Sequence, residues 1–224
     1  MMSQRALVVA VVGGLVLGAG SRLTDHVAPR WVGDAAAVWV LAAFCAGALV
    51  TSRRDGARLG VTCLFTACAT YYLWRVWVDE RIWAEFLMFA GVFWFVASLL
   101  VGAAAGYAGA ASRRDRALWG VVAGAFIGEA LALWILGKDQ VQIALELGVG
   151  LALFFIARID LRRTAMVAVA VALTVAFLGV GYRLGFGLRR ALRGLAYRPA
   201  VSQIKEGPPV GDGPSLPAIL AAVS

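Results

Sequence analysis

The chain has 224 residues, of which 62% are hydrophobic and 15% are charged, and its mean hydropathy is +0.82. This composition excludes an ordinary soluble domain, in which about 25% of residues are charged. The net charge of +8 comes largely from arginines in short stretches between apolar segments, which indicates membrane topology rather than a nucleic-acid-binding face. We therefore expect the lipid bilayer as a partner and no nucleic acid.

Apolar segments of nearly the length that crosses a bilayer, roughly 20 residues, recur along the chain. They lie at 6–21, 35–51, 59–78, 84–110, 117–136, 141–157 and 164–182. The sequence therefore predicts an all-α, polytopic membrane helical bundle of about seven transmembrane helices within residues 1–183. A basic amphipathic juxtamembrane helix is expected at 184–198 and a Pro/Gly-rich C-terminal tail at 199–224.

The arginines predict the orientation of these helices. Basic loops at 52–58, 112–116 and 158–163 alternate with loops of lower positive charge, so we expect these three loops to be cytoplasmic in a protein of the cell membrane. Seven crossings then place the arginine-rich C-terminal tail outside. Six spans, with one segment failing to cross, are the alternative that keeps the tail inside.

Two of the basic loops also suggest an internal repeat. SRRDGARLGV at 52–61 matches SRRDRALWGV at 112–121 in seven of ten positions. The period is two spans, so the match predicts two-helix parallel repeats. The alternative is that the requirements on any cytoplasmic loop produced the same short string twice.

Small residues indicate where helices pack closely. Gly120, Gly124 and Gly128 recur at every fourth position and so lie on one face of a helix, where another backbone can approach. We favour packing within the bundle over a homodimer interface.

Two acids lie within the apolar segments. Glu129 follows Arg116 by 13 residues, roughly 20 Å at helical rise, and Glu146 lies in the next segment, joined to it by a tight turn at 137–140. An ion at such depth is costly, so each acid should be protonated, paired or facing water. The two segments should form an antiparallel hairpin that brings both acids into the outer half of the membrane.

Aromatic and basic residues are expected at the same depth, which predicts an outer-half ligand-binding pocket. Its residues are Glu129, Glu146, Tyr71, Tyr72, Arg75 and Trp94. Carboxylates and aromatic faces suit a small organic cation, and a desolvated glutamate suits a proton-coupled step. The structural alternative is that Glu129 pairs with Arg75 or hydrogen-bonds a neighbouring helix.

Other kinds of site are not indicated. The chain has a single histidine, and Cys45, Cys63 and Cys68 lack metal-ligand spacing, so we expect no metal and no cofactor. There is no phosphate-binding loop and no hydrolase motif, so catalytic residues are unknown and an enzyme is not favoured.

Three hypotheses for the function follow. The first is a membrane protein that binds or transports a small molecule, such as a cation. The second is an accessory or assembly subunit that docks a protein partner through its C-terminal tail. The third is an intramembrane enzyme that uses a buried glutamate as acid or base.

Three stretches carry a resemblance to a known family. DAAAVWVLAAFCAGALV at 34–50, YYLW at 71–74 and GEALALW at 128–134 resemble uncharacterised actinobacterial multi-pass membrane proteins, classed as a domain of unknown function. The likeness covers about residues 11–180 and excludes the long C-terminal tail. It implies about seven helices in the cell membrane and brings no activity or catalytic residues.

Overall fold

The computed structural model describes residues 3–27, 35–78, 89–156, 161–176 and 179. The chain divides into two units, Met1–Val180 and Gly181–Ser224, and all the described residues belong to the first. Within these ranges the chain is helical and contains no strand.

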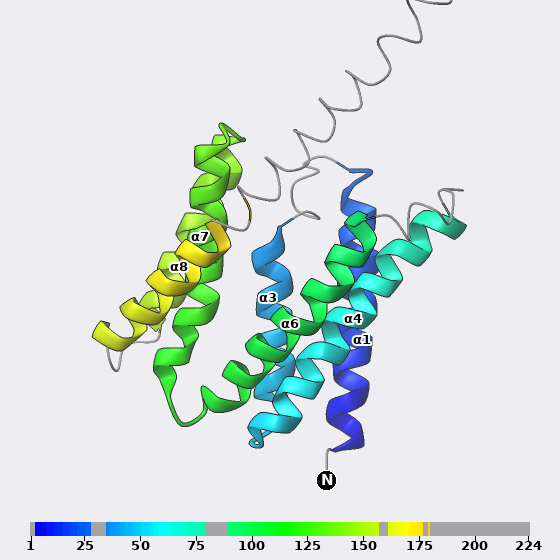
Figure 1. The fold of residues 1–224 in the computed structure, drawn as a ribbon, viewed down its shortest axis with the longest axis horizontal. Coiled ribbons are helices and arrows are strands. Elements are labelled where there is room, and N and C mark those ends of the chain that lie inside the picture. Colours follow the sequence, from blue (N-terminus) through cyan, green and yellow to red (C-terminus); the bar gives the residue numbers. More distant parts are fainter. Residues whose placement is uncertain (1–2, 28–34, 79–88, 157–160, 177–178, 180–224) are drawn as a thin grey trace, which may run out of the picture. The chain divides into compact units, whose positions relative to one another are not determined.

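Helices occupy the described parts of all seven predicted apolar segments (Figure 1). They are α1 (Gln4–Thr24), α3 (Ala36–Ala48), α4 (Arg53–Trp77), α6 (Phe89–Ala111), α7 (Trp119–Ile135, preceded by the short 3-10 helix η1, Arg116–Leu118), α8 (Gln140–Ile156) and residues 161–176. The helix predicted at 184–198 and the tail predicted at 199–224 lie outside the described residues.

Three described stretches are long and apolar enough to cross a membrane: Gln4–Thr24, Gly91–Ala111 and Arg116–Ile135. Two further apolar helices, Ala36–Ala48 and Gln140–Phe155, are shorter. At 13 residues, α3 is about 20 Å long, less than the roughly 30 Å thickness of a bilayer's hydrocarbon core. A helix as short as α3 needs partners for its terminal backbone groups.

Glycines let the helices approach closely. In α1, Gly14 and Gly18 face the backbone of α4, where added side chains would meet Cys63 and Ala67. The predicted glycine face of α7 is confirmed as a packing surface inside the bundle, because it lies against the helix of residues 161–176. The contacts are Gly120 with Thr164, Gly124 with Ala168 and Gly128 with Ala172.

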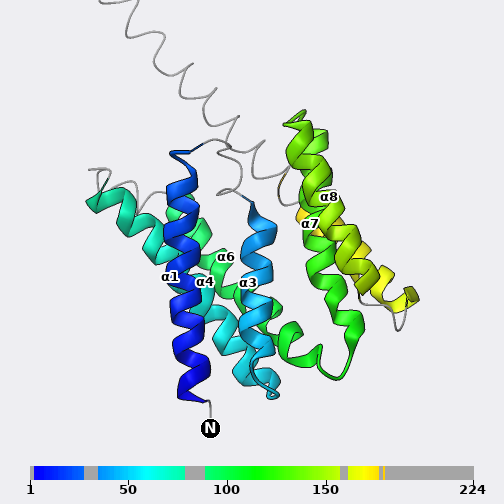
Figure 2. The same cartoon turned by 180° about the vertical axis from the view of Figure 1, so that it is seen from behind.

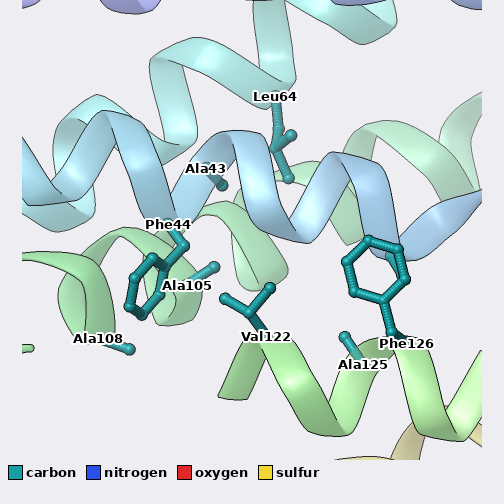
Figure 3. Packing of buried hydrophobic residues seen from close by; sticks show 9 residues of the cluster. Ala43, Phe44, Leu64, Ala105, Ala108, Val122, Ala125 and Phe126 are labelled. Carbon is teal, nitrogen blue, oxygen red and sulfur yellow. The ribbon is translucent and has the colours of Figure 1, made fainter. Parts of the chain in front are cut away.

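The core surrounds α3, which contacts α1, α4, α6 and α7 (Figures 1 and 2). Phe44 of α3 is fully buried and packs against Trp119, with ring centroids 4.8 Å apart. Figure 3 shows Val122 and Phe126 of α7 on one side of α3 and Leu64 of α4 on another. α3 is therefore the central helix of the described unit.

The packing does not support the internal repeat. α3 and α4 pack directly against each other, whereas α6 and α7 diverge from their connecting turn (Figure 1). The shared SRRD string also differs in local structure. Ser52 caps α4 by accepting a hydrogen bond from Asp55 N at 3.3 Å. Ser112 instead ends α6, and it is Asp115 that caps the following η1 by accepting from Ala117 N at 3.1 Å.

Candidate functional site

A tight turn joins α7 to α8. Gly137 has φ 62°, and Lys138 N donates to Leu133 O at 2.9 Å, so α7 ends in a Schellman motif. Asp139 then starts α8 by accepting from Val141 N at 2.8 Å. The two helices pack against each other as a hairpin. Because Glu129 lies eight residues before Gly137 and Glu146 nine after it, both acids sit at about the same level.

Glu129 caps the N-terminus of α3. Its Oε1 accepts a hydrogen bond from Ala36 N at 2.9 Å, and its Oε2 accepts one from Ala37 N at 2.6 Å. The N-cap residue of α3 is Ala35, whose side chain cannot cap. A carboxylate suits this place because the first N–H groups of a helix are unpaired and carry partial positive charge. These contacts agree with the structural alternative, in which Glu129 hydrogen-bonds a neighbouring helix.

The other end of α3 is bound by a cation. Arg113, in the turn after α6, donates from Nε to Ala48 O at 2.8 Å. A guanidinium favours the negative end of a helix dipole. The segment from Arg113 to Glu129 therefore supplies to each end of α3 a group whose charge is opposite to the partial charge of that end.

Glu146 has a different environment. Its side chain is 4% exposed, and Gln142 Nε2 donates to Oε1 at 2.7 Å. Its other oxygen, Oε2, is buried and has no hydrogen-bond partner. Glu129 lies at about the same level on the neighbouring helix. A buried carboxylate with one bare oxygen beside a second acid is costly unless a proton or another cation accompanies it.

Gln142 was missed by the sequence analysis. It is buried at 6% exposure, one helical turn before Glu146 on the same face of α8. The i, i+4 spacing of the two residues in QVQIALE was the available signal.

The predicted phenols belong to a second polar cluster, which also includes Arg22 of α1 and Asp25, the C-cap residue of α1. The Tyr71 hydroxyl donates to Asp25 Oδ2 at 3.0 Å, and Arg22 donates to the same oxygen at 2.6 Å. The Arg22 guanidinium also lies 6.0 Å from the centroid of the Tyr71 ring. Tyr72 packs edge-on against Tyr71, at 5.4 Å between centroids. Arg22 and Asp25 were not among the predicted site residues, and their i, i+3 spacing was the available signal.

Two predicted pocket residues remain. Arg75 is half-buried in the last turn of α4. Trp94 of α6 is 40% exposed and packs edge-on against Phe93, at 5.4 Å between centroids.

Within the described residues, no group of three or more His, Cys, Asp or Glu side chains is placed to hold a metal ion. The three cysteines there are free thiols.

The described residues place this protein in the class of all-helical proteins with helices long and apolar enough to cross a membrane. Residues 2–191 match a family of unknown function, DUF6518, and the chain belongs to that family. No curated protein and no solved structure matches the chain.

Proposed function

We propose that this is a multi-pass protein of the cell membrane, with the basic loops 52–58, 112–116 and 158–163 in the cytoplasm. The distribution of side-chain sizes supports this. Small residues fill the interior, while large apolar side chains face outward on α1, α4, α6, α7, α8 and residues 161–176. In α1, Gly14 is buried and Val16 is 66% exposed. Water would make such a surface prone to association, whereas lipid solvates it and leaves close packing of small residues to join the helices.

The ends of the helices support the proposed orientation. In Figures 1 and 2 the N-terminus of α1, the start of α4 and the turn between α6 and α7 lie at the same end of the described unit. That end carries Arg53, Arg54 and Arg113, all of which are exposed.

We further propose that the protein binds or transports a small cation, with Glu146 as the binding group. The observation that carries this proposal is the buried Oε2 of Glu146, which has no hydrogen-bond partner. Glu129 contributes charge to the site, but both of its oxygens already accept hydrogen bonds from α3. Glu146 is therefore the acid with an oxygen left for a ligand.

The proposal is tested by cation-dependent stability. Methylammonium and tetramethylammonium chloride are added to the purified protein, with sodium chloride at matched ionic strength as reference, and thermal unfolding is followed. A bound cation stabilises the folded state by about 2.7 kcal/mol at 100 times its Kd. We expect one of these probes to raise the unfolding temperature of the wild type and to have no effect on Glu146→Gln.

Asp139→Asn is the matched control, because Asp139 is an exposed acid at the start of the same helix. It should respond to the probe as the wild type does. An equal response in Glu146→Gln, or no response of the wild type to either probe, would contradict organic-cation binding at this site.

A second candidate function is that of an accessory or assembly subunit with a protein partner at the C-terminal tail. It is favoured by the use of Glu129 as a helix cap, which is a structural role. Because of this role, Glu129→Gln should disturb folding under either hypothesis, and Glu146→Gln is the better discriminating variant. An intramembrane enzyme ranks third and would use Glu146 as acid or base.

A further inference from the structure

We infer that the hydrogen bonds from α3 to Glu129 form a proton-sensitive latch, which holds the N-terminus of α3 against α7 and opens when Glu129 is protonated. The inference rests on the proposed function, because it links the cation held by the two acids to a conformational change at the N-terminus of α3.

The latch lies between two groups of helices. Among the labelled helices, α1, α4 and α6 pack together with α3, and α8 packs on α7. Contacts between these groups run mainly from α3 to α7. Two of the hydrogen bonds at this junction join Glu129 of α7 to the backbone of Ala36 and Ala37. Loss of these bonds therefore loosens the junction at one end of α3.

The latch needs an anion. Both carboxylate oxygens accept hydrogen bonds from α3, and the negative charge faces the positive end of the helix dipole. A proton on Glu129 removes the charge and places an O–H donor beside two N–H donors. The protonated side chain keeps one good acceptor, its carbonyl oxygen, so the bond to the other oxygen is lost or weakened and the first turn of α3 is loosened.

Glu146 is the neighbouring group that can hold the proton while the latch is closed. Glu146 is buried and lies at about the level of the part-buried Glu129 on the neighbouring helix, and a buried carboxylate beside a second acid does not stay ionised at low cost. Its unpartnered Oε2 is the free position. A proton also needs no cavity, unlike a larger cation. The resting state is then an ionised Glu129 that caps α3, beside a protonated Glu146.

Within the described residues, the elements that pack against α7 differ in the charged side chains they carry. The described α3 and α6 contain no acidic or basic side chain, and Cys45 lies nine residues along α3 from Ala36. On the helix of residues 161–176, Arg162 and Arg163 precede Thr164, which packs at Gly120, roughly 14 Å along α7 from Glu129. Lys138 and Asp139 lie in the exposed turn. Glu146 is therefore the acid placed to exchange a proton with Glu129.

The test measures exposure of the N-terminus of α3. In a chain whose three cysteines are replaced by alanine, Ala37→Cys places a thiol at the latched end, where Ala37 is 2% exposed. Ala46→Cys places one near the other end, where Ala46 is 6% exposed. The rate of maleimide labelling at position 37 is divided by the rate at position 46, so that the pH dependence of thiol chemistry cancels.

In the otherwise unchanged chain, the labelling ratio should rise as the pH falls. In Glu129→Gln it should be raised about fivefold at every pH, the opening expected from loss of a helix cap. Glu146→Gln imitates the protonated neighbour, so it should keep the ratio low while losing the response to the ammonium probes. A low ratio combined with a normal probe response in Glu146→Gln overturns the proposed cation site and leaves the latch standing.

A further variant separates a latch from a simple cap. Ala35→Ser supplies a local N-cap to α3 without any bond to α7. Combined with Glu129→Gln it should leave the labelling ratio high. Return of the ratio to the wild-type value overturns the inference, since Glu129 would then act only as a cap. A labelling ratio in Glu129→Gln equal to that of the wild type also overturns the inference. Labelling that rises equally at positions 37 and 46 overturns it as well.

Discussion

Two acids in apolar helices have different surroundings, and this difference is the basis of the roles that we propose for them. Glu129 has a hydrogen-bond donor at each oxygen, so its ionised form is stabilised by α3. Glu146 has a donor at one oxygen only. Because an unmatched buried oxygen costs free energy, the second acid is the one expected to bring in a proton or another cation.

A substitution at Tyr71 tests whether the cluster of Arg22, Asp25 and Tyr71 is separate from the proposed cation site. Tyr71→Phe removes the hydroxyl that donates to Asp25. We expect the free energy of unfolding to fall by about 1 kcal/mol, the usual net value of one hydrogen bond. Binding of the ammonium probe should be unchanged, because this hydroxyl is engaged with α1. Chemical unfolding and the thermal assay measure both quantities, and loss of probe binding would return Tyr71 to the cation site.

At the scale of residues, the sequence predicted part of the site. Glu129 and Glu146 could be predicted to share a level because they flank one glycine turn at nearly equal distances. The partner of Glu129 could not be predicted. Its ligands are backbone N–H groups, which every residue carries, and their position depends on where α3 begins and how it packs.

At the scale of elements, α3 explains why an acid is tolerated inside α7. It is short and central, and its own N-cap residue is an alanine. Its terminal groups are bonded by Glu129 at one end and Arg113 at the other. Both come from the segment between the end of α6 and the middle of α7, so this segment and α3 should depend on each other for stability.

Substitutions at two adjacent glycines of α1, Gly13 and Gly14, test the close packing of α1 against α4. A side chain at Gly14 would meet the carbonyl of Cys63 and, at 2.9 Å, Cβ of Thr66, whereas nothing lies within 4 Å of one at Gly13. We expect Gly14→Ala to lower the free energy of unfolding by about 1–3 kcal/mol through overpacking. Gly13→Ala should be neutral or stabilise by up to about 1 kcal/mol through helix propensity. Thermal unfolding followed by circular dichroism compares them, and equal effects would reject the close α1–α4 contact.

Local sequence patterns predicted the individual helices and their glycine faces better than they predicted which helices pack together. The glycine spacing in α7 indicated a packing face, and the structure identifies its partner as residues 161–176. The matching SRRD strings indicated a repeat that the packing does not support. Four identical residues start one helix and end another because their neighbours differ, with α4 following immediately in one case and a turn in the other.

For the whole molecule, the arrangement of side chains by size is the main physical feature. Among the described residues, alanine and glycine dominate the interior, and valine, leucine and aromatic residues are the main large side chains on the exterior. Composition alone predicted a helical bundle, and the described residues are helical in all seven expected places. In the proposed membrane environment, moving large apolar side chains from lipid into the interior gains little free energy. A buried polar atom without a partner is therefore the more informative feature of the interior.

The central claim is that Glu146 holds a cation, which is a proton when no other is bound. Infrared spectroscopy of the purified protein in lipid at neutral pH tests it most directly, through the carbonyl stretching band of a protonated carboxylic acid. We expect this band in the wild type and in Asp139→Asn, and its loss in Glu146→Gln. A wild type without the band, or a Glu146→Gln variant that keeps it in full, would contradict the claim.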